Sequence, residues 1–253
     1  MNLNLIYKLK MNVFPGIKII DLALYFEECR TLVIGDLHLG YEEMLNKKGI
    51  LVPFFQYKKI IEHMDFIFRE CKPDRIIIAG DLKHEFGTIT DQEWGEVLRF
   101  LDYLSLQTEN IILIKGNHDT VIGPIANKKN IKIFDNYCFE NENKKIYVTH
   151  GHYVPDDKDF SDLDVVVVGH EHPAIALRDE TRSEKIKCFL KGSFRAKNLI
   201  VIPSFNFLTE GTDVASEGTL SPFLDQDIGD FEVYAVEKKE VLYFRKLNNL
   251  LNY

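Results

Sequence analysis

The sequence predicts an α/β fold, a four-layer α-β-β-α sandwich of two mixed β-sheets that lie face to face and are flanked by helices. Short β-branched runs bounded by glycine recur through the first two thirds of the chain, and such runs are typical of buried strands. Segments with helical periodicity separate the first three runs, as in an α/β layer structure. After about Val165 the helical pattern gives way to alternating segments, which favour antiparallel pairing.

Five runs are expected to form buried strands, because each is short, apolar and followed by a polar cluster. They are residues 31–34, 75–79, 111–114, 146–149 and 164–168. Two helices are expected between the first three runs. Residues 55–71 carry an apolar stripe at helical spacing and end before Pro73. Residues 91–104 carry another, with Thr90 or Asp91 as the N-cap.

The last third of the chain is expected to complete the sheets. Alternating positions predict strands at residues 174–178, 186–190, 199–202, 231–236 and 241–244. The connection 203–229 is long and rich in Gly, Ser, Thr and Asp, which predicts a lid or a substrate-facing loop. We expect one domain over residues 1–253, with its motif-bearing core at about 30–175 and the sheet completion and loop at about 176–253. Because residues 1–10 resemble a short leader, Met1 and Met11 are alternative starts.

The composition is that of an ordinary globular protein, with 45% hydrophobic and 28% charged residues in 253. No apolar run approaches the ~20 residues of a membrane span and no signal segment is visible, so we predict a cytoplasmic protein without a membrane partner. The four isolated cysteines, Cys29, Cys71, Cys138 and Cys188, are typical of free thiols in a reducing compartment. A net charge of −8 argues against a broad basic surface for nucleic acid, although bound metals would make a cleft locally positive.

Side chains able to bind metals follow all five of the glycine-bounded runs. They are Asp36 with His38, Asp81 with His84, Asn117 with His118 and Asp119, His150 with His152, and His170 with His172. Seven of the 8 histidines fall in these places. Because ligands collect at the carboxyl ends of strands in α/β sheets, we expect one site at this edge. The donors exceed the about four to six that one cation needs, so they predict two cations with a shared ligand.

The ligand types narrow the choice of metal. Carboxylate, imidazole and amide without thiolate suit transition metals better than Ca²⁺ or Mg²⁺, which take mainly oxygen ligands. We therefore predict two divalent ions, with Mn²⁺ favoured and Fe, Zn, Co or Ni as alternatives. The set is too rich for a structural zinc site, which about four ligands would satisfy.

The sequence resembles, in order, the five signature blocks of the calcineurin-like metallophosphoesterase superfamily. The matching motifs are Asp36-x-His38, Gly80-Asp81, Gly116-Asn117-His118-Asp119, His150-Gly151 and Gly169-His170-x-His172. The residues around them, at 35–42, 80–86, 169–173 and 203–206, are similar to the archaeal branch related to the SbcD nuclease. Bacterial relatives of that branch are called DNA-ligase-associated phosphoesterases. The superfamily resemblance spans about residues 30–175 and the narrower one most of the chain.

This resemblance implies a role for each motif residue. The implied metal ligands are Asp36, His38 and His172 for the first ion and Asn117, His150 and His170 for the second, with Asp81 as the bridge. A bridging carboxylate offers one oxygen to each cation. His118 would contact the phosphate or protonate the leaving oxygen, with Asp119 orienting its ring. A water activated by the two metals would attack phosphorus in line.

The remaining polar residues of these regions leave alternatives open. His84 matches a histidine that acts on the scissile phosphate in the nuclease relatives, and its alternative is a capping or supporting role. His152 is expected to support a ligand more than to bind metal. His63 is expected to be partly buried and structural, and Ser204 and Asn206 are candidates to line the cleft.

We predict a metal-dependent phosphodiesterase that acts on nucleic acid or nucleotides, with a DNA-repair protein as an expected partner and the oligomeric state left open. The alternatives are a phosphomonoesterase or nucleotide phosphatase on the same metals, and a non-catalytic interaction scaffold. The chain after His172 is too short for the capping domain of double-strand-break nucleases. Short single strands, nucleotides or small diesters are therefore favoured over processive cleavage of duplex DNA.

Overall fold

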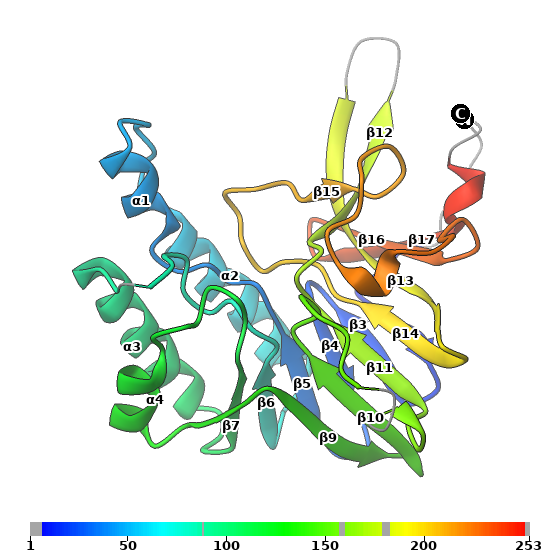
Figure 1. The fold of residues 1–253 in the computed structure, drawn as a ribbon, viewed down its shortest axis with the longest axis horizontal. Helices are drawn as coiled ribbons and strands as arrows, with labels where there is room; N and C mark the ends of the chain where they lie inside the picture. Colours follow the sequence, from blue (N-terminus) through cyan, green and yellow to red (C-terminus); the bar gives the residue numbers. More distant parts are fainter. Residues whose placement is uncertain (1–6, 88, 157–159, 179–182, 251–253) are drawn as a thin grey trace.

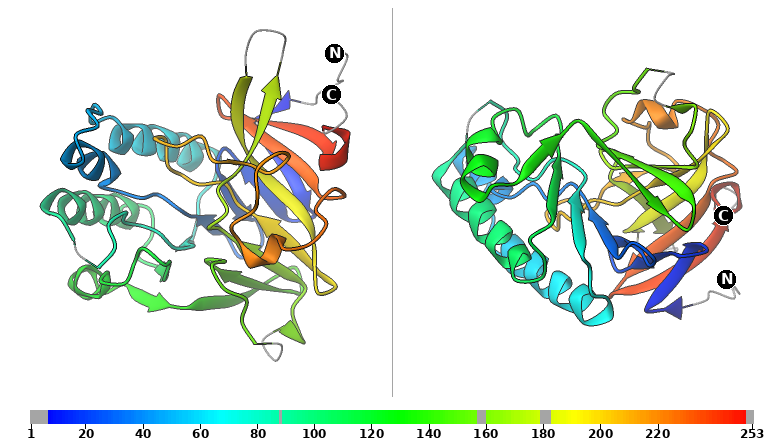
Figure 2. Two further views of the ribbon diagram at one scale, coloured as in Figure 1. Left: turned by 45° about the horizontal axis from the view of Figure 1, so that its top comes forward. Right: turned by 90° about the horizontal axis from the view of Figure 1, so that it is seen from below.

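Two mixed β-sheets pack face to face in the computed structural model, which describes residues 7–87, 89–156, 160–178 and 183–250. Helices cover the smaller sheet on its outer side, as seen in Figure 1 and from two further directions in Figure 2. The predicted α/β class with two mixed sheets is confirmed. None of the helices in the described part of the chain is long and apolar enough to span a membrane.

The seven-stranded sheet comes from the first half of the chain. Its strands, in spatial order, are β2 (Lys10–Phe14), β3 (Ile17–Ile20), β4 (Ala23–Phe26), β5 (Thr31–Ile34), β6 (Arg75–Ile78), β7 (Ile111–Ile114) and β8 (Lys132–Phe134). Pairing is antiparallel from β2 to β5 and parallel from β5 to β8. The three runs predicted first are β5, β6 and β7, so their carboxyl ends share one edge.

Four α-helices occur in the described residues, all of them before β8 in the chain. They are α1 (Tyr41–Lys47), α2 (Gln56–Glu70), α3 (Asp91–Ser105) and α4 (Gly123–Lys129). The two predicted helices, α2 and α3, lie within two residues of their expected bounds. Thr90 is the N-cap of α3, and it forms a reciprocal capping box with Glu93.

The ten-stranded sheet comes mainly from the second half. Its main path runs β1 (Tyr7–Lys8), β17 (Glu240–Lys246), β16 (Glu232–Glu237), β13 (Ser183–Phe194), β14 (Lys197–Val201), β11 (Val165–Val168), β10 (Lys144–Thr149) and β9 (Asn136–Asn141), with β12 (Pro173–Arg178) and β15 (Thr212–Asp213) alongside. β10, β11 and β14 are parallel neighbours. The other strands of the path pair antiparallel, as predicted for this half.

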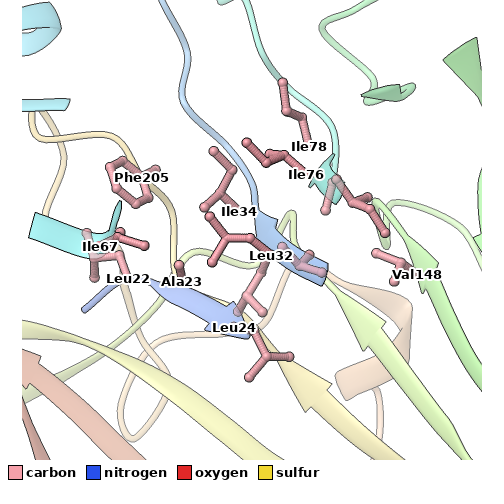
Figure 3. Packing of buried hydrophobic residues seen from close by; sticks show 14 of the residues in the cluster. Leu22, Ala23, Leu24, Leu32, Ile34, Ile67, Ile76, Ile78, Val148 and Phe205 are labelled. Atoms are coloured by element: carbon pink, nitrogen blue, oxygen red, sulfur yellow. The ribbon is translucent and has the colours of Figure 1, made fainter. Parts of the chain in front are cut away.

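The core between the sheets explains why the strand ends are fixed. Figure 3 shows Ile34 of β5, Ile76 of β6 and Val148 of β10, which belong to one buried cluster with Phe205 and with Ile67 of α2. Burial of each such side chain stabilises the fold by about 1.5–3 kcal/mol. The edge where β5, β6, β10 and β11 end therefore rests on tightly packed layers.

The outer face of the ten-stranded sheet differs from the predicted four-layer arrangement. In the described residues this face is covered by loops and 3₁₀ turns in place of α-helices: Phe160, Val214, Phe223 and Leu224 pack on it, the last two from η2 (Pro222–Leu224). A second turn, η3 (Leu247–Asn249), follows β17. The connection 203–229, predicted to be a lid, thus contributes to this second core.

The sequence patterns missed the strands β2, β3 and β4. These strands are only four or five residues long and are joined by tight turns at Gly16 and Asp21, both with positive φ. Met11 lies inside β2, and the preceding Tyr7–Lys8 pairs with β17. Residues ahead of Met11 therefore take part in both sheets.

Candidate metal centre

The loops that follow β5 and β6 are hydrogen-bonded to each other beyond the ends of the strands. The amides of Asp36, His38 and Leu39 donate to the carbonyl oxygens of Gly80, Asp81 and Leu82 at 3.0, 2.9 and 3.0 Å. The amide of His84 then donates back to Leu39 at 3.1 Å. These bonds hold the two loops as one rigid edge and fix the side chains that project from it.

Five of the seven predicted metal ligands have left-handed backbone conformations. They are Asp36 (φ 54°), His38 (47°), Asp81 (47°), His170 (67°) and His172 (52°). Residues with a Cβ rarely adopt positive φ, and held strain of this kind costs about 1–3 kcal/mol per residue. Such strain concentrates at functional sites, where the fold compensates for it. Here it turns the side chains at the strand ends toward a common centre.

The first cluster contains Asp36, His38 and His172, as the sequence predicted. The Nε2 atoms of the two histidines are 3.3 Å apart, and His172 Nε2 is 3.3 Å from Asp36 Oδ1. This Oδ1 is buried and accepts no hydrogen bond from the described residues. The other oxygen of Asp36 accepts the amide of His170 at 3.1 Å.

The second cluster contains Asp81, His150 and His170, with Asn117 beside them. His150 Nε2 is 2.9 Å from Asn117 Oδ1, 3.2 Å from His170 Nδ1 and 3.4 Å from Asp81 Oδ2. The other nitrogen of His150 faces the carbonyl oxygen of Ala79 at 3.0 Å, which fixes the ring. Gly80 has φ 95°, and a Cβ at that position would lie 2.4 Å from this ring, so only glycine fits there.

Asp81 lies between the two clusters. Its Oδ2 is 3.4 Å from His150 Nε2 and 3.8 Å from His38 Nε2. Its Oδ1 accepts the amide of His118 at 2.9 Å. The expected arrangement had one oxygen for each cation. Here the single free oxygen, Oδ2, faces both clusters.

The geometry fits cations. Two ligands each about 2.1 Å from one ion, at the angles of tetrahedral or octahedral coordination, are about 3.0–3.4 Å apart. The ring nitrogens and oxygens of each cluster converge at 2.9–3.4 Å. Imidazole nitrogens that approach one another in this way, next to an unpartnered Asp36 Oδ1, are suited to share a metal ion. The donor set is carboxylate, imidazole and one amide, which suits transition metals.

The ionisable groups of the two clusters shift one another's pKa values. Burial opposes ionisation of Asp81, but its hydrogen bond with His150 and the charge on that ring hold the pKa of the carboxyl below its usual range. Burial likewise opposes protonation of His150, yet its bond to Asp81 and the charge of Asp36 raise the pKa of the ring to about 9. Burial and the charge on His150 lower the pKa of His170 to about 4. His170 is therefore held in the neutral form that binds metal, whereas His150 would have to release a proton when it binds metal near pH 7.

His118 and His84 form a third group with His38, next to the two clusters. His118 Nδ1 donates to the carbonyl oxygen of His84, and its Nε2 is 3.9 Å from Asp81 Oδ2. Because a carbonyl only accepts, Nδ1 carries the hydrogen and Nε2 is the atom that can exchange a proton. His84 stacks on Tyr41 with centroids 3.8 Å apart, and its Nδ1 is 3.3 Å from His38 Nδ1.

Asp119 has a different environment from the one expected. It is fully buried and accepts the amides of Gly116 at 3.1 Å and of Leu82 and Lys83 at 3.4 Å. The ring of His118, which Asp119 was expected to orient, is bonded to the carbonyl of His84 instead. Burial raises the pKa of Asp119 to about 6. Its carboxylate ties together the loops after β6 and β7.

Three buried glutamates that the sequence analysis did not single out brace the same loops. Glu93 accepts the amides of His84 and Glu85 at 3.1 and 2.6 Å. Glu96 accepts the amide of Gly40 at 3.2 Å, and Glu42 accepts two amides at the start of α2 at 2.6 and 2.8 Å. The capping box Thr90-x-x-Glu93 was a visible signal for the first of them.

The other candidates have supporting positions. His152 lies outside the three histidine-containing groups, with its ring centroid 5.2 Å from that of His150. Ser204 accepts a hydrogen bond from Lys187 Nζ at 2.6 Å, and Asn206 accepts the amide of Leu208 at 2.8 Å. His63 is partly buried and its Nδ1 is 2.6 Å from Asp21 Oδ2, as expected for a structural residue.

Comparison with solved structures finds phosphoesterases among the similar chains. The nuclease MPE of Pseudomonas putida has 18% identity and a TM-score of 0.62, and the match covers 91% of this chain and 96% of that one. The phosphoesterase Yfce of E. coli has 15% identity and a TM-score of 0.41, covering 87% and 93%. An archaeal phosphodiesterase has 16% identity and a TM-score of 0.40, covering 69% and 83%. Among curated proteins, no sequence matches.

The family model for calcineurin-like phosphoesterases matches residues 29–193. This span is more than half of the chain and includes every residue of the three histidine-containing groups. The superfamily resemblance predicted from the five motifs is confirmed, whereas the narrower SbcD-related branch stays a prediction. The chain belongs to the calcineurin-like phosphoesterase family and is a hydrolase of phosphoester bonds.

Proposed function

We propose that this protein is a two-metal phosphodiesterase that cleaves nucleic acid strands or nucleotides. The observation that carries the proposal is the pair His84 and His118. Neither belongs to the two metal clusters, yet both rings lie beside His38, and His118 Nε2 is 3.9 Å from the open oxygen of Asp81. The fold shared with a nuclease supports only the architecture, so the case for a diester rests on these side chains.

The residues that would hold the metals are those of the sequence prediction. Asp36, His38 and His172 would bind one ion, Asn117, His150 and His170 the other, and Asp81 would join them, with Mn²⁺ as the proposed metal. When bound, two such cations neutralise phosphate charge and make water more acidic. The strained, hydrogen-bonded loops hold the ligands ready, so little reorganisation accompanies binding.

His118 is the proposed general acid. When a phosphodiester is hydrolysed, one ester oxygen departs as an alkoxide, and it departs slowly unless it is protonated. A correctly placed general acid raises the reaction rate by about 10²–10⁴. The carbonyl of His84 holds Nδ1 of His118, so Nε2 points to the side of Asp81 where the scissile phosphate would lie. The same contact makes the position of His118 depend on the loop that Glu93 braces.

His84 is proposed to donate a hydrogen bond to a non-bridging phosphate oxygen. Burial and the charge on His118 lower the pKa of His84 to about 4, which keeps the ring neutral. Stacking on Tyr41 orients it. A neutral donor suits the single negative charge of a diester better than the double charge of a monoester.

The proposal extends to a cytoplasmic setting and a DNA-repair partner, as expected from the sequence.

The test is the hydrolysis of a chromogenic phosphodiester beside its matched monoester, using protein stripped with a chelator and reloaded with Mn²⁺. We expect kcat/KM to favour the diester by about tenfold or more, which is less than the about 10²–10⁴ of a positioned acid because a chromogenic leaving group needs little protonation. Preference for the monoester would identify a phosphatase on the same metals. Inactivity on both substrates, with metal shown to be bound, would contradict the proposal for simple diesters.

A further inference from the structure

A second cavity lies outside the metal centre, between α2, β13, the turn from β16 to β17 and residues 207–210. Its volume is about 510 Å³, within the about 300–1,000 Å³ of typical ligand sites. None of the residues that line it belongs to the metal clusters. The lining residues that matter most are Lys59, His63, Lys185, Lys187, Phe207 and Lys239.

Three lysines of this cavity have no carboxylate partner among the described residues. The ammonium of Lys59 lies over the rings of Phe55 and Phe207, 5.4 and 5.9 Å from their centroids. Lys187 Nζ donates to the hydroxyl of Ser204 at 2.6 Å, and Lys239 Nζ donates to the carbonyl of Glu62 at 3.4 Å. By contrast, Lys185 and Lys238 pair with glutamates at 2.7 and 3.1 Å. Cations left with neutral partners around one cavity favour an anionic ligand.

Four carboxylates also line the cavity and offset part of the charge of its lysines. They are Asp21, Glu184, Glu210 and Glu237. Asp21 is bonded to His63, and Glu237 and Glu184 lie beside Lys238. By formal charge five lysines face these four carboxylates, so the cavity lining is far less acidic than the chain as a whole, whose net charge is −8.

The cavity also offers features that suit a nucleoside. The rings of Phe207 and His63 pack with centroids 4.5 Å apart and form an aromatic wall, and bases stack on such rings. Asp21 holds His63 in this wall, because its Oδ2 is 2.6 Å from His63 Nδ1.

Lys187 connects this cavity to the metal centre. It lines the cavity, and Asp36 of the first cluster is the acidic group that acts most strongly on its ammonium. Its partner Ser204 precedes Phe205, whose amide donates to the carbonyl of Gly35 at 2.9 Å, directly before Asp36. Burial lowers the pKa of Lys187 to about 7, against the opposing effect of Asp36. An anion in the cavity would stabilise its charged form.

We infer that this cavity binds the nucleotide next to the scissile bond of a single-stranded nucleic acid, with its phosphate among Lys59, Lys187 and Lys239 and its base beside Phe207. The inference rests on the proposed function and narrows it. The substrate would be a strand with at least two phosphates, in contrast to a small diester with one. Attraction would come from this cavity and the metals, since the chain as a whole is acidic.

The test compares Lys59→Glu and Lys239→Glu with Lys58→Glu as the matched control. Lys58 precedes Lys59 on α2, is 84% exposed and does not line the cavity. Binding of a labelled oligothymidylate to chelator-treated protein is measured by fluorescence anisotropy at low salt. The kcat/KM for the same strand and for the chromogenic diester is measured with Mn²⁺. We expect each cavity variant to weaken binding and strand cleavage by about tenfold, as for a lost phosphate contact, with unchanged turnover of the small diester.

Several outcomes would decide the matter. Equal weakening by Lys58→Glu would mean that general charge attracts the strand and would overturn the inference. So would equal loss on the small diester, because the lysines would then act through the metal centre. Wild-type protein that cleaves the small diester, with variants that bind the strand normally, would refute the cavity assignment alone. Strand binding that depends on Lys59, in a protein that cleaves neither substrate, would support the cavity and refute the proposed function.

Discussion

Asp81→Asn is expected to lower diester turnover by more than about 10³-fold, because the two cations together supply several kcal/mol of transition-state stabilisation. Asp81 Oδ2 is the one free oxygen that faces both clusters, at 3.4 Å from His150 and 3.8 Å from His38. Asparagine retains the shape and can still accept the amide of His118 through its oxygen. The NH2 group of the asparagine would then occupy the place of Oδ2 and direct a hydrogen-bond donor toward both ions.

The measurement is the metal content of the purified variant by elemental analysis, together with kcat on the chromogenic diester. Asp102→Asn is the matched control. It makes the same chemical change at a carboxylate that is 62% exposed on α3 and pairs with Lys129, where little is expected to change. Circular dichroism would show that both variants fold. Full metal content with normal turnover in Asp81→Asn would exclude Asp81 as the bridge.

His118→Asn is expected to lower kcat on the diester by about 10²–10⁴ while both metals stay bound. The Nε2 of His118 is 3.9 Å from Asp81 Oδ2, farther than the 2.9–3.4 Å at which the atoms within each cluster converge. Its loss would remove the proton donor but leave the metal ligands in place. The effect should shrink for an ester whose leaving group is already acidic, because such a group needs less protonation.

His150→Asn provides the comparison for His118→Asn. His150 is fully buried and contacts Asn117, His170 and Asp81 within the second cluster, so its replacement should remove metal as well as activity. The two histidines are thus expected to separate metal binding from proton transfer. If His118→Asn lost its metals as His150→Asn does, His118 would be a ligand and the assignment of roles would be wrong.

The strand ends could be predicted from the sequence because buried strands are apolar and the loops that follow them are polar. Apolar runs such as 31–34 and 75–78 must be followed by a change in polarity where the chain leaves the core. Asp36 and Asp81 directly follow those changes. Since parallel strands end at a common edge, linear spacing was enough to bring distant motifs together.

What the sequence could not reveal depends on contacts between distant segments. The left-handed backbone at Asp36 and His170 has no local signal, since neither residue type demands it. The contact of His118 with the His84 carbonyl depends on how two loops meet, and so does the burial of Asp119. The second cavity joins α2 to β13 and the turn after β16, which lie far apart in the chain. Periodicity reports which face is buried but not what it is buried against.

The number of metal ions that activity requires distinguishes a two-metal centre from a site that uses one ion. Chelator-treated wild-type protein would be titrated with Mn²⁺, with bound metal and diester hydrolysis measured at each step. We expect activity to rise until two ions are bound per chain and then to stay constant, since the clusters around Asp36 and around His150 would each hold one. Full activity with a single bound ion, or with none, would contradict the two-metal proposal.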